Sequence, residues 1–298
     1  MAYALVTPTK DEENSLPELI ESIKSQSVPP VLWVVVDDGS VDSSRAILKE
    51  AKSELPYLKI VRLELKKRNY DLGFRYSYLV KKGIDVVLNS EFKKEIEYLG
   101  IIDADMYCAP DYFQHLLERF KKEPKLGIAS GIVYSKKDGN FVREGGRPDL
   151  PRGSGRLISV KCLLDCGGYK LYRSMDSVLN IKAQHRGWLT RSFSDLKIYQ
   201  ARETSSRYGY WQGFFHKGET NYYLGFSLFS ALLKSIYYTV SRPYYTSLSY
   251  LLGYLSQILK KEKKIPDKEI RDYYRKEHLK RSVSYHLALL KEKVKKNV

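Results

Sequence analysis

One stretch of this 298-residue chain is the starting point for predicting its fold, Tyr98-Leu99-Gly100-Ile101-Ile102-Asp103-Ala104-Asp105-Met106. Four of its first five residues are apolar, which is typical of a strand covered on both faces. Asp103 and Asp105 follow at the C-terminal end of this strand, where open α/β sheets bind their ligands. Residues two apart on an extended segment point the same way, so both carboxylates could bind one Mg²⁺ or Mn²⁺ ion. The alternative is a solvated acidic loop.

The segments on either side of this stretch alternate between strand and helix patterns. We predict strands at 3–8, 31–36, 58–63, 126–134 and 196–200. We predict helices at 16–23, 43–51 and 71–83, one from 110, one that ends at Gly167-Gly168 within the stretch 164–169, and one at 177–186. Residues 85–97 could continue a helix or form an inserted segment. The order strand, helix, strand, helix, strand favours an α/β fold with a doubly wound, mostly parallel sheet.

The charge of the chain is unevenly distributed. Residues 201–298 hold 19 of the 51 Lys and Arg residues but 8 of the 35 Asp and Glu residues, and so carry +11 of the net charge of +16. From residue 208 onward the sequence becomes rich in Tyr and Lys with helical patterns. We therefore predict an α/β domain over residues 1–207, with halves of about 1–106 and 107–207, and a basic helical region over 208–298. The basic excess indicates an anionic partner.

Cysteine usage and the N-terminus bear on the compartment. Cys108, Cys162 and Cys166 are the three cysteines, too few for a disulfide framework, and no zinc-finger spacing surrounds them. The first six residues lack the basic leader and the apolar length of a signal peptide. These features predict a cytoplasmic protein.

Asp37-Asp38-Gly39-Ser40 is a second acidic motif at the end of a predicted buried strand. A carboxylate at this place can accept hydrogen bonds from a base or a ribose hydroxyl, as in dinucleotide folds. The alternative is an Asx-turn that caps the next helix. The sequence has no G-x-G-x-x-G after its first strand and no G-x-x-x-x-G-K-[ST], which disfavours dinucleotide oxidoreductases and P-loop enzymes.

A third group of motifs lies further along the chain. Gly153-Ser154-Gly155-Arg156 and Cys166-Gly167-Gly168-Tyr169 precede Met175-Asp176. With Asp37 and the Asp103-Ala104-Asp105 motif, these segments resemble the family 2 glycosyltransferases of GT-A fold over roughly residues 3–200. The resemblance implies an inverting enzyme that moves a sugar from a nucleotide diphosphate, most often UDP, to a hydroxyl of a glycan or lipid-linked acceptor.

The resemblance assigns the first half to the nucleotide sugar and to Mn²⁺ or Mg²⁺. Asp105, with Asp103, matches the metal-binding carboxylates. The residues implied in donor binding are Pro8, Thr9, Asp11, Glu12, Asp37, Arg75, Asp103, Ala104 and Asp105.

The resemblance assigns the second half to the acceptor. Asp176 matches the general base, and one base facing the anomeric carbon implies displacement with inversion, since a retaining double displacement needs a second carboxylate. Met175 replaces an acidic residue of the family, and Gln200 replaces a histidine that sometimes completes the metal site. The implied acceptor-side residues are Gly153, Gly155, Met175 and Trp211.

Two rival functions are left open by the sequence. The net charge of +16 could serve nucleic-acid binding, although no binding fingerprint accompanies it. A catalytically impaired homologue could act as a scaffold. No nucleic acid is expected as partner of the enzyme.

We predict that the C-terminal region binds the anionic surface of a membrane, on the inner, cytoplasmic face of that membrane. The uncharged stretches Asn221–Leu233 and Pro243–Leu259 are shorter than the roughly 20 apolar residues of a spanning helix. Their tyrosines suit an interface, and lysines flank them. The alternative is a helical pair packed on the α/β domain or on a second copy of the chain.

Overall fold

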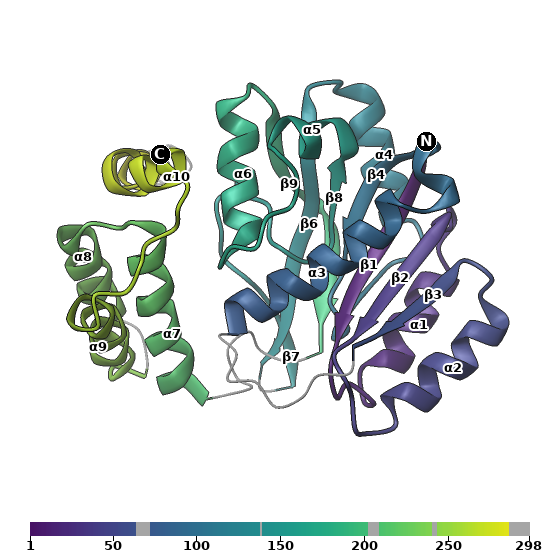
Figure 1. Cartoon of the computed structure of the whole chain (residues 1–298), viewed down its shortest axis with the longest axis horizontal. Helices are drawn as coiled ribbons and strands as arrows, with labels where there is room; N and C mark the ends of the chain where they lie inside the picture. Colours follow the sequence, from purple (N-terminus) through teal and green to yellow (C-terminus); the bar gives the residue numbers. More distant parts are fainter. Residues whose placement is uncertain (64–71, 138, 202–208, 240–242, 286–298) are drawn as a thin grey trace, which may run out of the picture. The chain divides into compact units, whose positions relative to one another are not determined.

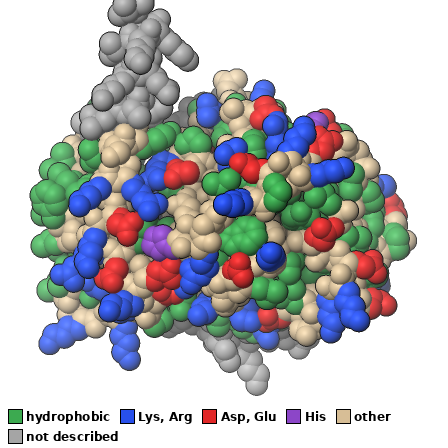
Figure 2. Space-filling view, turned by 90° about the horizontal axis from the view of Figure 1, so that it is seen from above, with side chains coloured by type: hydrophobic (Ala, Val, Ile, Leu, Met, Phe, Trp, Pro, Cys, Tyr) green, Lys and Arg blue, Asp and Glu red, His purple; other side chains and the backbone are tan. Residues whose placement is uncertain are grey.

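The computed structural model describes residues 1–63, 72–137, 139–201, 209–239 and 243–285. These residues form two compact units, Met1–Glu203 and Thr204–Val298. The boundary expected at residue 207 lies outside the described residues. Lys and Arg side chains are spread over the face shown in Figure 2, as the net charge requires.

The first unit is built on a sheet of nine strands among the described residues, in the order β3-β2-β1-β4-β8-β6-β9-β5, with β7 beside β6. Neighbours from β3 to β4 are parallel, as are β6 and β9, whereas β8 and β5 run antiparallel to their neighbours. The strands are β1 (Ala2–Thr9), β2 (Leu32–Asp37), β3 (Leu58–Arg62), β4 (Ile96–Ile101), β5 (Met106–Cys108), β6 (Leu126–Lys137), β7 (Asn140–Arg143), β8 (Arg156–Ser159) and β9 (Leu189–Gln200).

Helices cover both faces of this sheet (Figure 1). Helices α3, α5 and α6 lie on one face, and α1, α2 and α4 lie on the other. The central strands β1 and β2 are accordingly apolar on both sides, because each face must be buried. The helices are α1 (Leu16–Lys24), α2 (Ser44–Glu54), α3 (Leu72–Leu88), α4 (Tyr112–Lys122), α5 (Val160–Asp165) and α6 (Met175–His185), with a 3₁₀ turn η1 at Glu91–Lys94.

This architecture confirms the predicted α/β class with a mostly parallel sheet. Several segments differ from the prediction. The short strands β5 and β7 were not expected, β9 begins at Leu189 and not at residue 196, and Arg156–Ser159, expected in an acceptor-side loop, forms β8 between β4 and β6. Residues 85–97 divide between the end of α3 at Leu88, the turn η1 and the start of β4.

The second unit is helical, as expected. None of the described helices is long and apolar enough to cross a membrane. The helices are α7 (Gly209–Leu224), α8 (Leu228–Thr239), α9 (Thr246–Leu259) and α10 (Lys268–Asp272), with a π-helical turn η3 at Tyr273–Glu277.

Helices α7 and α9 approach each other closely at two glycines. A Cβ on Gly218 would lie 2.0 Å from the Tyr250 carbonyl oxygen, and one on Gly253 would lie 2.1 Å from the Phe215 carbonyl oxygen. Because the obstacle in both cases is backbone, the helices would have to move apart to admit a methyl group.

We expect Gly218→Ala to destabilise the protein by about 1–3 kcal/mol or more, since overpacking of a fitted interface costs this much. Chemical denaturation measures the change. Gly146→Ala is the control, because nothing lies within 4 Å of a Cβ at that position. Equal stability of both variants would contradict the close packing of α7 and α9.

Candidate active site

Three strand ends meet at one edge of the sheet. In β1 and β2, Thr9 pairs with Asp37, and the Asp38 amide donates to the Thr9 carbonyl oxygen at 2.9 Å. Asp103 follows β4, which lies on the other side of β1. The parallel order therefore gathers the predicted donor residues at the carboxyl edge, where ligands bind in this kind of sheet.

The acidic loop after β1 is hydrogen-bonded to the segment after β2. The Asp11 amide donates to Ser40 Oγ at 2.9 Å, and the Glu12 amide donates to Ser44 Oγ at 2.8 Å. Asp11 itself has a left-handed backbone, with φ of 52°. The predicted donor residues Pro8, Thr9, Asp11 and Glu12 thus belong to one ordered rim. The Thr9 hydroxyl is buried on that rim without a hydrogen-bond partner among the described residues.

Asp37 and Asp38 have different partners. Asp37 accepts from the Ser40 amide at 2.9 Å and from Arg62 Nη1 at 3.1 Å. The Ser40 contact is local, three residues on, and it does not cap α2, which begins at Ser44 without a side-chain cap. Asp38 forms a buried bidentate ion pair with Arg75, in which Arg75 Nε donates to Asp38 Oδ2 at 2.8 Å. The predicted residues Asp37 and Arg75 therefore lie on the same rim, each held by a charged neighbour.

Asp103 is fixed by two hydroxyl groups. Tyr76 on α3 donates to Asp103 Oδ1 at 2.8 Å, and the Asp103 amide donates to Ser154 Oγ at 2.7 Å. Burial raises the pKa of Asp103 to about 7, with further contributions from the negative charges of Asp105 and Asp176. Asp103 thus lies within electrostatic reach of both the other metal candidate and the predicted base.

Asp105 is buried beside the end of β9. Gln200 Nε2 donates to Asp105 Oδ2 at 3.1 Å, so the glutamine that replaces the family's histidine contacts this carboxylate. Among the described residues, no group of three or more His, Cys, Asp or Glu side chains is placed to hold a metal ion. Asp103 and Asp105 still fit Mg²⁺ or Mn²⁺, because they place two carboxylates two residues apart after β4 and such ions are commonly bound by one or two carboxylates plus substrate phosphates.

Asp176 lies in the first turn of α6, after Ser174 with its left-handed φ of 51°. Its side chain is about one-third exposed and lies against the loop before β8. A Cβ on Gly153 would lie 3.3 Å from the Asp176 Cβ. The predicted base therefore faces solvent on one side and the glycine-rich loop on the other.

Arg156 connects Asp176 to that loop. Its side chain is fully buried, and its Nε donates to the carbonyl oxygens of Arg152 and Gly153 at 2.8 and 3.0 Å. Its Nη2 lies 3.9 Å from Asp176 Oδ2. Arg156 thus links the glycine-rich loop to the first turn of α6, where it lies beside the predicted base.

Sequence reasoning missed Tyr76, Tyr169 and Arg156 as parts of the site. Burial raises the pKa of both tyrosines, and the charge of Asp176 contributes to both shifts. The two phenols therefore stay protonated beside the carboxylates. No sequence motif marks Tyr76, whereas Arg156 and Tyr169 end the motifs Gly153-Ser154-Gly155-Arg156 and Cys166-Gly167-Gly168-Tyr169, which assigned no role to these two side chains.

The remaining predicted acceptor residues fall in different surroundings. Gly155 has φ of 67° and packs against Ile198, whereas Met175 is buried in the core. Trp211 belongs to the second unit, where its ring lies 6.0 Å from that of Tyr245. The acceptor contact of Trp211 stays a prediction.

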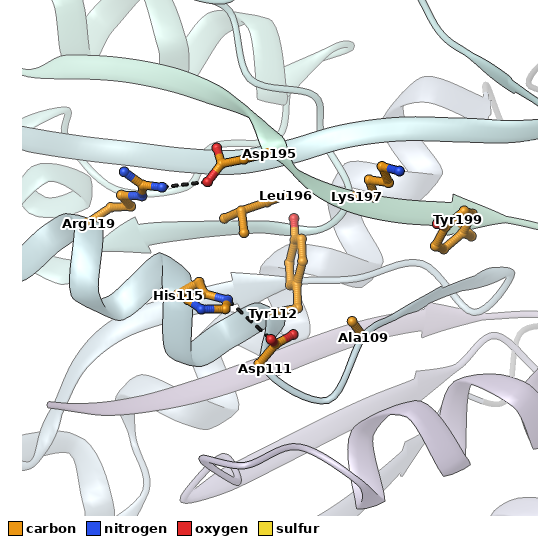
Figure 3. Close-up of a pocket in the computed structure, with 9 residues that line it drawn as sticks. All are labelled: Ala109, Asp111, Tyr112, His115, Arg119, Asp195, Leu196, Lys197 and Tyr199. Atoms are coloured by element: carbon orange, nitrogen blue, oxygen red, sulfur yellow. Dashed lines mark hydrogen bonds and ion pairs between the residues drawn. The ribbon is translucent and has the colours of Figure 1, made fainter.

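A pocket of about 330 Å³ lies elsewhere, between α4 and β9 (Figure 3). Arg119 pairs with Asp195 at 2.5 Å, and His115 Nδ1 lies 3.6 Å from Asp111 Oδ2. None of the predicted site residues lines this pocket. The lining residues are Ala109, Asp111, Tyr112, His115, Arg119, Asp195, Leu196, Lys197 and Tyr199.

The strand order, with Asp37 ending β2 and Asp103 following β4 at one edge of the sheet, is an α/β arrangement of the GT-A kind. Residues 4–178 match the family model described as glycosyl transferase family 2. The match covers more than half of the chain, and the chain belongs to this family.

Curated relatives share part of the sequence. The poly-β-1,6-N-acetyl-D-glucosamine synthase of Staphylococcus epidermidis is 29% identical over 122 residues, which are 41% of this chain and 26% of that protein. The putative glycosyltransferase EpsH of Bacillus subtilis is 26% identical over 129 residues, 43% of this chain and 33% of that protein. The chain thus spans about a quarter to a third of the curated relatives that it matches.

Solved structures show the same fold. The S. aureus TarS fragment 1–349 in complex with UDP-GlcNAc has a TM-score of 0.53 at 16% identity, covering 87% of this chain and 73% of that one. The mannosyltransferase PcManGT from Pyrobaculum calidifontis, in complex with GDP-Man and Mn²⁺, also has a TM-score of 0.53 at 16% identity, covering 85% and 69%.

Crowding between Gly153 and Asp176 gives a first test of the site. In Gly153→Ala the new methyl group would lie within 3.4 Å of Asp176 Oδ2. We expect sugar transfer to fall by about tenfold or more, because small misplacements of catalytic groups are costly. Steady-state assays measure it, with Gly146→Ala as the unobstructed control in the same loop. An active Gly153→Ala enzyme would argue against Asp176 as the acting group.

Proposed function

We propose that this protein transfers a sugar, with inversion, from a nucleotide diphosphate to a hydroxyl of a glycan or lipid-linked acceptor. UDP is the favoured donor nucleotide. The shared contact of Asp103 and Asp176 with one loop carries the proposal, because the Asp103 amide donates to Ser154 Oγ at 2.7 Å and a Cβ on the neighbouring Gly153 would lie 3.3 Å from the Asp176 Cβ. A candidate base and a candidate metal carboxylate thus belong to one cluster at the carboxyl edge of the sheet.

Different residues of the chain would bind the donor and remove the proton from the acceptor. The rim of Thr9, Asp11 and Asp37 would bind the nucleoside, and Asp176 would take the proton from the acceptor hydroxyl as its oxygen attacks the anomeric carbon. The anomeric C–O bond to the diphosphate then breaks on the opposite side, which inverts the configuration. Arg156 would orient the Asp176 carboxylate through its contact at 3.9 Å.

Asp105 and Asp103 would hold Mn²⁺ or Mg²⁺ together with the donor phosphates. When bound, the ion neutralises charge on the departing diphosphate as a Lewis acid. The neighbouring structure of PcManGT is in complex with Mn²⁺, which supports this choice of ion. Gln200 would orient Asp105 through its amide hydrogen bond.

The enzyme would act at the inner, cytoplasmic face of the membrane, where a lipid-linked acceptor is within reach. The basic excess of residues 201–298 supports this placement, since cytoplasmic leaflets carry anionic lipids.

A thermal-shift panel of UDP-, GDP- and dTDP-sugars with Mn²⁺ tests the proposed function. A specific donor at a hundred times its Kd stabilises the fold by about 2.7 kcal/mol. Donor hydrolysis or transfer with inverted product should accompany the same nucleotide. A protein that no donor stabilises and that turns over none would instead be a scaffold.

A further inference from the structure

Helix α8 presents its large apolar side chains to the outside of the C-terminal unit. They recur at spacings of four residues in two adjacent rows, so they cover one continuous face of the helix. Each is at least 40% exposed within the described residues. We call this set the α8 stripe, and it consists of Leu228, Phe229, Leu232, Leu233, Ile236 and Tyr237.

The buried side of α8 has the opposite character. Ser230, Ala231 and Ser235 are the buried residues of this helix, and Ser235 Oγ lies 2.9 Å from Ser247 Oγ of α9. The buried positions of α9 include Thr246 and Gly253. Small and hydroxyl-bearing residues inside, with large apolar residues outside, are the arrangement of helices that pack together in lipid.

Helix α9 repeats the exposed part of this pattern, whereas its buried residues also include the large side chains Tyr250, Tyr254 and Gln257. Its exposed residues include Leu248, Leu252 and Leu259, and Tyr244 and Tyr245 precede it. Hydrophobic side chains gather at the left-hand edge of Figure 2, on the C-terminal unit. Soluble monomers seldom expose so many large apolar side chains in one region. This surface is therefore a candidate binding surface for another molecule or for a membrane.

The charges nearby indicate what covers the stripe. The single charged residue of α8, Lys234, lies with its Nζ 5.2 Å from the buried Phe226 ring, away from the stripe. Four exposed lysines follow α9, and they would meet anionic headgroups while the apolar residues meet acyl chains. These lysines are Lys260, Lys261, Lys263 and Lys264.

We propose that the α8 stripe inserts into one leaflet of an anionic lipid bilayer. A helix of 12 residues is about 18 Å long, well short of the ~30 Å hydrocarbon core, so α8 would lie in the interface and not cross it. This proposal deepens the membrane placement given under the proposed function, because it names the surface that enters the lipid.

Co-sedimentation of the full chain with vesicles of phosphatidylcholine and phosphatidylglycerol tests the insertion. The wild-type protein should pellet and remain partly bound at high salt, because acyl contacts are not screened. Leu232→Glu with Ile236→Glu should lower partitioning by about tenfold or more. The matched control is Phe141→Glu with Leu164→Glu, two exposed apolar residues of the first unit, and it should bind as the wild type does.

Fluorescence distinguishes insertion from surface attachment. Brominated acyl chains should quench a tryptophan in Phe229→Trp and not one in Phe141→Trp. Three results would overturn the insertion. The wild-type protein could be released completely from the vesicles by high salt, or the double variant Leu232→Glu with Ile236→Glu could bind as well as the wild type. Sedimentation velocity could also show that the α8 stripe forms a dimer interface. Donor-dependent thermal stabilisation should be the same in all variants, so a failed insertion leaves the test of catalysis intact.

Discussion

Asp176→Asn should lower sugar transfer by about 10²–10⁴-fold, the usual worth of a general base. Asparagine has nearly the same shape, so the first turn of α6 and the contact with Arg156 should persist. It cannot accept the proton of the acceptor hydroxyl, and the loss should appear in kcat. Asp85→Asn on α3 is the matched control, since that carboxylate is paired with Lys81 at 2.8 Å on the surface.

Two measurements accompany the Asp176→Asn assay. Donor binding, followed by thermal shift, should equal that of the wild type, because the donor rim is formed by the ends of β1, β2 and β4. The anomeric configuration of the wild-type product should be inverted. An active Asn variant or a product of retained configuration would remove Asp176 from the role of base.

The parallel half of the fold could be predicted from the sequence because its strands are continuous apolar runs. Val31–Val36 and the stretch before Asp103 are buried on both faces, so their composition alone identifies them. The expected strand ends then placed Asp37 and Asp103 at one edge, and the structure gathers them there.

The antiparallel half could not be predicted in the same way. The strands β5, β7 and β8 have three or four residues, too few for a periodic pattern to show. β8 also begins with Arg156, whose charge suggests a loop. The first half of β9 carries polar residues such as Thr190 and Ser192 and shifts register against β6, so the sequence revealed its last five residues alone.

One contact within the site depends on these missed elements, because β8 sets Arg156 inside the sheet, where it reaches Asp176, 20 residues later in the sequence. A second contact joins two predicted elements, since Tyr76 on α3 reaches Asp103 after β4 although the two residues are 27 apart in the sequence. A local sequence motif cannot predict a contact between residues so far apart, although each residue of these two pairs lies in or next to a segment that the sequence analysis had singled out.

Asp105→Ala is expected to abolish the part of donor binding that depends on the divalent ion. Removing this carboxylate leaves Asp103 as the single acidic ligand at the strand end, and one carboxylate should not hold Mn²⁺ on the donor diphosphate. Its loss also removes the acceptor for the Gln200 amide, which donates to Asp105 Oδ2 at 3.1 Å. The expected result is a donor-induced thermal shift that Mn²⁺ no longer enlarges.

The comparison requires the donor with Mn²⁺ and the donor with excess chelator, for both the wild type and the variant. In the wild type the chelator should remove most of the stabilisation, whereas in Asp105→Ala the two curves should coincide. Asp111→Ala, an exposed acid in the pocket between α4 and β9, should behave as the wild type. Donor affinity that is unchanged by chelator in the wild type would mean that the paired aspartates act without a metal, through their hydrogen bonds to Tyr76 and Gln200.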